Sequence, residues 1–260
     1  MRFSVFLTLV LIVLIGPSCN KVNIFSLDQD RQLGKQVNDE ILSKPKEYPV
    51  LPERGNEEVY RYVRGITTKL LNSGKVKNKD AFAWEVRIIN DDATLNAFCT
   101  PGGYIYVYTG LIKYLDSEEQ LAGVMGHEIA HADLRHSTKA MTKQYGMAAL
   151  LQIATGGEGS AAQLGQIAAG LTSLKFGRDA EKEADTYSVV YMCPTNYEAD
   201  GAADFFVKLQ AAGGSRPPVF MSTHPDPGNR VANIQGHAKE LGCTGTATNK
   251  AAYDRIKSML

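Results

Sequence analysis

Two histidines and a glutamate with a fixed spacing could do chemistry in this chain. His127 and His131 are four residues apart, and Glu128 directly follows the first of them. On a helix, side chains at positions i and i+4 project from one face about one turn apart, so two imidazoles can share a metal ion. The glutamate beside them is placed to take a proton from a water molecule. This H-E-x-x-H pattern predicts the active-site helix of a zinc metalloprotease.

The helix that carries these residues is predicted to begin at Ser117. Ser117 and Gln120 have the spacing of a capping box, in which each side chain bonds a free backbone amide of the first turn. Apolar residues follow at helical spacing, and the pattern extends the helix through Met141. The competing interpretation is a buried helix in which two histidines occur without a metal.

A catalytic zinc takes a third protein ligand and keeps one coordination position open. A serine stands six residues after His131, which excludes the metzincin arrangement with its third histidine. A gluzincin instead takes a glutamate from a later helix. Glu181 is favoured, because Asp185 lies four residues on and can hydrogen-bond the outer nitrogen of a ligand histidine. The alternatives that stay open are Glu183 in the same helix and Glu158 in a glycine-rich loop.

Short strands precede the active-site helix. Apolar and polar alternation with aromatic content predicts them over residues 84–90, 95–98 and 104–109. Residues 101–103, Pro-Gly-Gly, predict a turn between the second and third strands. An exposed edge strand can bind an extended peptide through its backbone. We therefore predict that Asn96, Ala97 and Phe98 form a substrate edge, and that protein or peptide substrates bind there as an extended strand.

The rest of the chain is predicted to be mostly helical. Helices are predicted over residues 26–43, 56–72 and 198–212. A further helix is predicted to end at residue 241 and a last one to begin at residue 249. Two more are predicted across the Ala- and Gly-rich stretch 146–174. The first two are predicted to form one layer over the catalytic core. The predicted fold is α+β and mostly helical, a zincin-like gluzincin with a small sheet packed on the active-site helix.

Length and composition set the broad class. The chain has 260 residues, 44% of them hydrophobic, and a formal net charge of zero, so nothing indicates a nucleic-acid partner. An apolar run over residues 3–15 follows Arg2 and is typical of an export signal. Residues 1–19 are therefore predicted to be a signal peptide and 20–260 a zinc metallopeptidase domain.

The end of the signal resembles a bacterial lipoprotein cleavage site, with Cys19 as the acylated residue. This predicts an exported, periplasmic protein held at the membrane by a lipid. Ordinary cleavage near Ser18 and an uncleaved anchor are the alternatives. In an oxidising compartment Cys193 and Cys243 are the candidate disulfide, because Cys99 lies close to the proposed metal site. Three free thiols remain the other possibility.

The ordered motifs of the chain together resemble metallopeptidase family forty-eight, the gluzincins that include HtpX and the CAAX prenyl proteases. The matching segments are residues 96–98, 101–103, 126–131, 135–137, 178–185 and 223–225, with Arg230. The chain is most similar to the exported, lipoprotein-type branch of that family. The resemblance implies a protease that removes misfolded or misassembled envelope proteins.

The resemblance also implies a role for each residue of the site. His127, His131 and Glu181 would bind one zinc ion per chain, Glu128 would be the catalytic residue, and Asp185 would support a ligand histidine. In related periplasmic proteases the histidine that matches His224 can approach the zinc and hold the enzyme latent. His224, Arg230 and a tyrosine are candidates for stabilising the oxyanion. The alternative function is a latent or weakly proteolytic periplasmic chaperone or assembly factor on the same fold.

Overall fold

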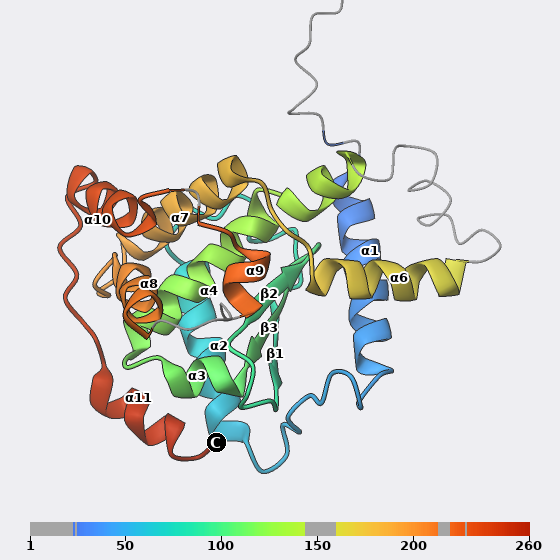
Figure 1. Ribbon diagram of the computed structural model, residues 1–260, viewed down its shortest axis with the longest axis horizontal. Coiled ribbons are helices and arrows are strands. Elements are labelled where there is room, and N and C mark those ends of the chain that lie inside the picture. The colour runs from blue at the N-terminus through green and yellow to red at the C-terminus, as the bar shows by residue number, and fades with distance from the viewer. Residues whose placement is uncertain (1–22, 24, 144–159, 213–218, 227) are drawn as a thin grey trace, which may run out of the picture.

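The computed structural model describes residues 23, 25–143, 160–212, 219–226 and 228–260 (Figure 1). These residues form a mostly helical α+β fold with one small sheet, as predicted. Their elements in chain order are α1 (Leu27–Leu42), α2 (Glu57–Leu71), β1 (Glu85–Ile89), β2 (Ala97–Thr100), β3 (Tyr104–Tyr108), α3 (Thr109–Tyr114), α4 (Glu118–Asp133), α6 (Ser160–Thr172), α7 (Arg178–Met192), α8 (Gly201–Ala212), α9 (Val219–Thr223), α10 (Arg230–Glu240) and α11 (Lys250–Lys257).

The three predicted strands form a sheet with the order β1-β3-β2. β3 pairs antiparallel with β2 and parallel with β1. The predicted turn joins β2 to β3, and its Gly102 and Gly103 have φ angles of 76° and 86°, a region that favours glycine. β2 therefore lies at an edge of the sheet.

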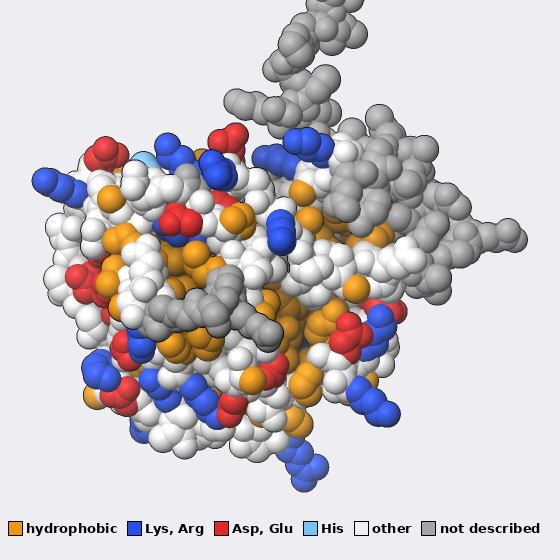
Figure 2. Space-filling model, in the orientation of Figure 1, with side chains coloured by type: hydrophobic (Ala, Val, Ile, Leu, Met, Phe, Trp, Pro, Cys, Tyr) orange, Lys and Arg blue, Asp and Glu red, His pale blue; other side chains and the backbone are white. Residues whose placement is uncertain are grey.

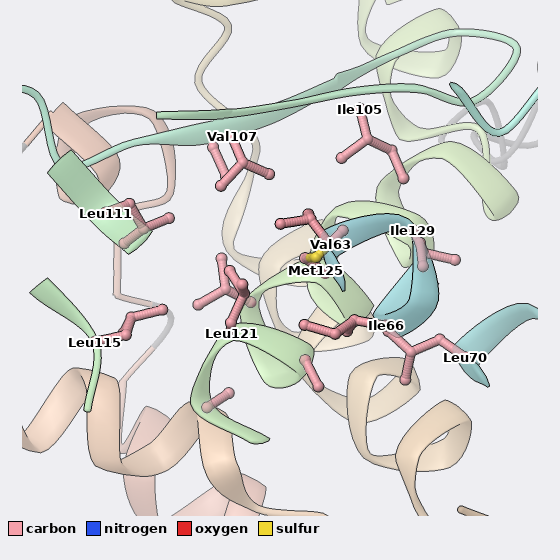
Figure 3. Close-up of a cluster of buried hydrophobic side chains, with 14 of the residues drawn as sticks. Val63, Ile66, Leu70, Ile105, Val107, Leu111, Leu115, Leu121, Met125 and Ile129 are labelled. Carbon is pink, nitrogen blue, oxygen red and sulfur yellow. The ribbon is translucent and has the colours of Figure 1, made fainter. Parts of the chain in front are cut away.

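Helices α1 and α2 do not form one layer; they cover opposite faces of the sheet, which corrects the prediction. Successive side chains of a strand point to opposite faces, so β3 contributes to two cores. Tyr104 and Tyr106 pack with α1, whereas Ile105 and Val107 face α2 and α4. Figure 3 shows Ile105 and Val107 of the sheet pointing toward one apolar cluster, to which α2 contributes Val63 and α4 contributes Met125.

The start of α4 differs from the predicted capping box. Ser117 is the residue before the helix, but its hydroxyl donates to the carboxylate of Glu119 instead of accepting from a backbone amide. The carboxylate is a charged acceptor and makes the stronger bond. The Gln120 side chain accepts from the backbone N–H of Asp116 at 2.9 Å. A complete capping box occurs at the start of α1, where Ser26 and Gln29 bond each other's backbone amides.

Helix α4 ends at Asp133 and does not run through Met141 as predicted. Arg135 has a φ angle of 60°, which ends the helix, and a new helical segment begins at His136. The side chain of Arg135 holds this break in place by donating to Asp30 and to the backbone carbonyl of Phe25. The interruption turns the chain directly below the H-E-x-x-H segment.

Two glycines let α4 approach its neighbours closely. A Cβ on Gly123 would lie 2.4 Å from the backbone nitrogen of Ala202 in α8, and one on Gly126 would lie 2.9 Å from Ser188 Oγ in α7. The Ser188 hydroxyl also donates to the backbone carbonyl of Gly123 at 2.7 Å. Close packing against α7 brings the residues of that helix within reach of the histidines of α4.

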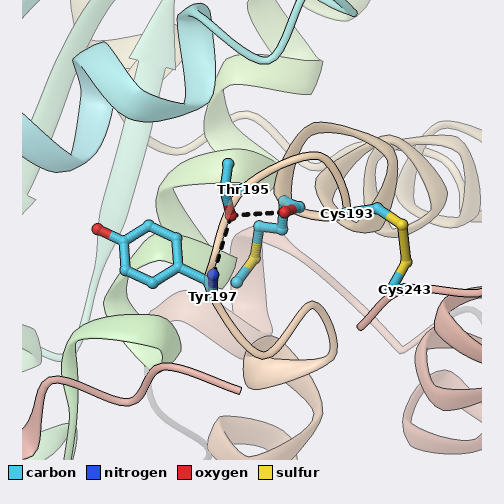
Figure 4. Close-up of a disulfide and its surroundings, with 5 residues drawn as sticks. Cys193, Thr195, Tyr197 and Cys243 are labelled. Carbon is cyan, nitrogen blue, oxygen red and sulfur yellow. Dashed lines mark hydrogen bonds between the residues drawn. A yellow bond between two sulfur atoms is a disulfide. The ribbon is translucent and has the colours of Figure 1, made fainter. Parts of the chain in front are cut away.

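A disulfide joins Cys193, at the end of α7, to Cys243, which follows α10 (Figure 4). The predicted pairing is confirmed, and Cys99 is a free, buried thiol in β2. The predicted signal peptide, residues 1–19, lies outside the described residues. Within the part that the structure describes, every helix is too short or too polar to cross a membrane.

Candidate metal centre

Four buried side chains converge between α4, α7 and the segment after α9. One nitrogen or oxygen atom from each of His127, His131, Glu181 and His224 lies within 4.8 Å of every other. The Nε2 atoms of His127 and His131 are 2.9 Å apart, and each is 3.5 Å from an oxygen of Glu181. Two imidazoles and a carboxylate are a donor set that catalytic zinc sites use. The residues therefore fit a zinc ion.

Helix α7 brings Glu181 and Asp185 to the cluster on one face. Asp185 Oδ1 lies 2.9 Å from His127 Nδ1, the nitrogen that points away from the cluster. Arg230, at the start of α10, is 1% exposed and donates to Asp185 at 2.7 Å, to Glu181 and to the backbone carbonyl of His224 at 3.1 Å. Each guanidinium nitrogen is thus engaged. Arg230 has the geometry of a residue that positions Glu181 and Asp185.

Glu128 lies at the edge of the cluster with a free carboxylate oxygen. It is 1% exposed, and among the described residues its Oε1 has no hydrogen-bond partner. His224 Nε2 is 3.5 Å from that oxygen. Burial raises the pKa of Glu128, although the neighbouring rings of His224 and His127 oppose the shift. A raised pKa brings a carboxylate closer to the range in which it can accept and return a proton.

The pKa values of the two α4 histidines are shifted in opposite directions. Burial disfavours the charged ring of His127, but hydrogen bonds to Asp185 and Glu181 outweigh it and raise the pKa to about 9. Burial lowers the pKa of His131 well below its ordinary value. Burial would raise the pKa of Glu181, but hydrogen bonds from His127, His131 and His224 hold it below its ordinary range. Glu181 is therefore the anionic centre of the group.

The segment around α9 closes the cluster from solvent. The backbone N–H of Phe220 donates to the carbonyl of Leu95 at 3.1 Å, and the Phe220 ring stacks on His224 with centroids 4.4 Å apart. His224 Nδ1 lies 3.1 Å from Glu181 Oε1 and 3.2 Å from His127 Nε2. His224, for which the family resemblance implied an approach to the zinc, thus stands among the predicted metal ligands.

Hydrophobic side chains are exposed on the face that carries α9. Figure 2 shows hydrophobic side chains gathered there and charged side chains around the rim. Val207 of α8 and Val219 of α9 are 46% and 45% exposed. An exposed apolar surface beside a buried polar cluster is a common setting for binding a peptide.

The predicted substrate edge matches an edge strand only in part: Ala97 and Phe98 lie in β2, whereas Asn96 precedes it, and the strand runs on to Thr100. The Tyr108 N–H donates to the carbonyl of Asn96, and Phe98 pairs with Tyr106. Antiparallel pairs alternate between bonded and non-bonded residues, so Ala97 and Cys99 direct their backbone groups away from β3. The Phe98 side chain stacks on Tyr106, on the α1 side of the sheet.

The structure also reveals contacts that the sequence did not predict. Phe176 stacks on the ring of His131 with centroids 3.9 Å apart. His136 Nδ1 lies 2.9 Å from His131 Nδ1, and its Nε2 lies 3.1 Å from Glu183. Glu183 is therefore directed at His136 and away from the cluster. The other alternative ligand, Glu158, lies outside the described residues. The Arg-His-Ser sequence after the H-E-x-x-H segment indicated that His136 packs or hydrogen-bonds beneath the site, but it did not identify His131 and Glu183 as its partners.

Comparison with known proteins places the chain in a family. The model of peptidase family M48 matches residues 57–238, a span that includes the four side chains of the cluster. The chain is 34% identical over 167 residues to the beta-barrel assembly-enhancing protease of Escherichia coli, 33% over 146 residues to the mitochondrial metalloendopeptidase OMA1 of Arabidopsis thaliana and 31% over 146 residues to the metalloprotease YcaL of Escherichia coli.

These matches cover 59%, 56% and 54% of this chain and 34%, 30% and 57% of the respective relatives. The chain thus spans about a third of the length of the first two. The family match covers well over half of this chain, and its span includes His127, His131, Glu181 and His224. The chain belongs to peptidase family M48.

Proposed function

We propose that this protein is a zinc-dependent endopeptidase that hydrolyses internal peptide bonds of exported proteins, in particular misfolded or misassembled envelope proteins. The observation that supports the activity best is the convergence of His127, His131 and Glu181 beside the free carboxylate of Glu128. The names of the relatives, a beta-barrel assembly-enhancing protease among them, support the substrate class. The proposal includes one zinc per chain and a periplasmic location, with a lipid on Cys19 as the membrane anchor.

In this proposal each residue has a defined task. Zinc held by His127, His131 and Glu181 supplies a Lewis acid that polarises the scissile carbonyl and lowers the pKa of a water molecule. Glu128 accepts the proton of the attacking water on its free oxygen and passes it to the leaving amine. Asp185 holds the ring of His127, and Arg230 holds Asp185 and Glu181. Both are positioning residues.

The substrate would bind along β2 as an additional strand. The outward backbone groups of Ala97 and Cys99 can pair with an extended peptide, with little demand on its side chains. The Phe220 N–H already bonds to Leu95 at the start of this edge. Access to the cluster therefore requires α9 and His224 to move aside.

The buried cluster also favours a second candidate, in which the protein is latent and acts mainly as a chaperone or assembly factor. Its specific support is His224, which is 1% exposed and bonded to Glu181. A protein with its site closed in this way would cleave rarely. The two functions differ in whether Glu128 is needed.

The test is Glu128→Gln in zinc-loaded protein, with unfolded casein and an envelope protein as substrates. We expect loss of cleavage by roughly 10²–10⁴-fold, because the general base is removed, with zinc retained at one per chain. Glu181→Ala should instead lose zinc. The endopeptidase proposal would be wrong if wild-type protein neither held stoichiometric zinc nor cleaved. An assembly function that Glu128→Gln keeps in cells would favour the chaperone.

A further inference from the structure

The outer nitrogens of the two α4 histidines have different partners. His127 Nδ1 meets a carboxylate directly, Asp185 at 2.9 Å. His131 Nδ1 meets another imidazole, His136 Nδ1, at 2.9 Å, and the far nitrogen of His136 lies 3.1 Å from Glu183. His131, His136 and Glu183 thus form a chain that ends at a carboxylate, with one ring more than on the His127 side.

When His131 binds a metal, the donor and the acceptor of each hydrogen bond in this chain can be assigned, because a neutral imidazole has one of each. His131 Nε2 faces the cluster, so it must present a lone pair to the metal, and Nδ1 must carry the proton. Nδ1 then donates to His136 Nδ1, which has to be the acceptor. His136 consequently carries its proton on Nε2 and donates it to Glu183. The opposite direction would put the proton on His131 Nε2 and block the ligand atom.

The chain depends on the break after α4. In an uninterrupted helix, residue 136 would stand five residues after His131 and be rotated about 140° around the helix axis from it. The left-handed conformation of Arg135 redirects the backbone, and His136 then lies beneath His131. The contacts of Arg135 with Asp30 and Phe25 tie this redirection to α1 and the segment before it. Phe176, which lies just before α7, stacks on the ring of His131.

We propose that His136 and Glu183 are positioning residues that fix the tautomer and orientation of His131 and thereby set the affinity of the site for zinc. Glu183 is the last residue of this hydrogen-bonded chain and lies at the surface. Its side chain is 48% exposed, whereas that of Asp185 is 3% exposed. The zinc affinity therefore depends on a surface carboxylate that is two hydrogen bonds away from the ligand His131. This inference rests on the assignment of His131 as a metal ligand in the proposed function.

The test measures how fast zinc leaves the loaded protein when an excess of a coloured chelator is added. Loss of a hydrogen-bond partner behind a metal ligand typically costs 10–100-fold in metal affinity. We expect His136→Ala to fall in that range, and Glu183→Gln at its lower end, about tenfold. Asp179→Asn, which removes another exposed carboxylate of α7, should leave the rate unchanged and serves as the matched control.

A conservative variant separates positioning from general structural support. In His136→Asn the side-chain oxygen stands where Nδ1 stood, so it still accepts from His131 but no longer reaches Glu183; its zinc release should therefore match that of Glu183→Gln and stay slower than that of His136→Ala. Nitrogen-15 NMR of the histidine rings in the zinc-loaded protein should show His136 protonated at Nε2. Thermal unfolding of the metal-free variants reports any damage to the fold separately.

Three results would overturn the inference: wild-type zinc release in folded Glu183→Gln, wild-type release in folded His136→Ala, or a proton on Nδ1 of His136 in the loaded protein. Each differs from failure of the proposed function, in which the wild-type chain itself holds no stoichiometric zinc. Because Glu183 is half exposed, its variant tests the inference even if His136→Ala does not fold.

Discussion

At the scale of single residues, His224 is the side chain through which we expect access to the cluster to be controlled. Its ring lies within hydrogen-bond distance of Glu181 and His127 and approaches Glu128, so it occupies the space between the predicted metal ligands and the predicted base. A hydrogen bond to a charged group contributes about 1.5–3 kcal/mol. The closed arrangement therefore loses a substantial stabilising contact when this ring is removed.

We predict that His224→Ala cleaves unfolded casein faster than wild type, by roughly tenfold, because the closed arrangement loses a contact of that size. Initial cleavage rates at equal zinc content measure the effect. His237→Ala is the control, since His237 lies on α10 and, within the described ranges, its side chain contacts Thr186 and Glu240 and none of the cluster residues. A slower His224→Ala enzyme would assign the ring to stabilising the oxyanion and not to latency.

At the scale of elements, the site depends on the close approach of α4 to α7 and α8. Gly123→Ala would place a methyl group 2.4 Å from the backbone of Ala202. Backbone cannot move aside as a side chain can, so we predict a loss of about 1–3 kcal/mol in the free energy of unfolding. Gly65→Ala in α2 meets nothing within 4 Å and should gain about 0.5–1 kcal/mol. Urea unfolding measures both; equal stability of the two variants would contradict the packing argument.

At the scale of the whole molecule, the disulfide closes a loop of 50 residues that contains α8, α9, His224 and Arg230. It holds the end of α7 to the end of α10, and both helices contribute to the site (Figure 4). A cross-link of this kind stabilises chiefly by restricting the unfolded chain. The disulfide therefore restrains α7 and α10, the two helices that carry Glu181, Asp185 and Arg230, relative to each other.

We predict that the double variant Cys193→Ser, Cys243→Ser loses about 2–4 kcal/mol in the free energy of unfolding. Denaturant unfolding with and without a reductant provides the comparison. The reductant should bring wild type to the stability of the variant and leave the variant unchanged. If both proteins unfolded at the same denaturant concentration without reductant, the disulfide would have no stabilising role.

The sequence alone determined the features that rest on local periodicity. Backbone hydrogen bonds four residues apart place His127 with His131, and Glu181 with Asp185, on one face of their helices wherever those helices lie. The sequence signals for the strands and for the turn at Gly102 were also local, because side-chain alternation and a turn at glycine depend on neighbouring residues. For the cysteines the sequence indicated only a candidate pair, Cys193 and Cys243, with three free thiols as the alternative.

Only the tertiary structure decided how these pieces meet. The order β1-β3-β2, the placement of α1 and α2 on opposite faces, the end of α4 at Asp133 and the entry of His224 into the cluster all depend on contacts between distant segments. The break at Arg135 is the clearest case, because Asp30, more than a hundred residues earlier, holds it. Residue spacing fixes which side chains share a face, but packing fixes what that face meets.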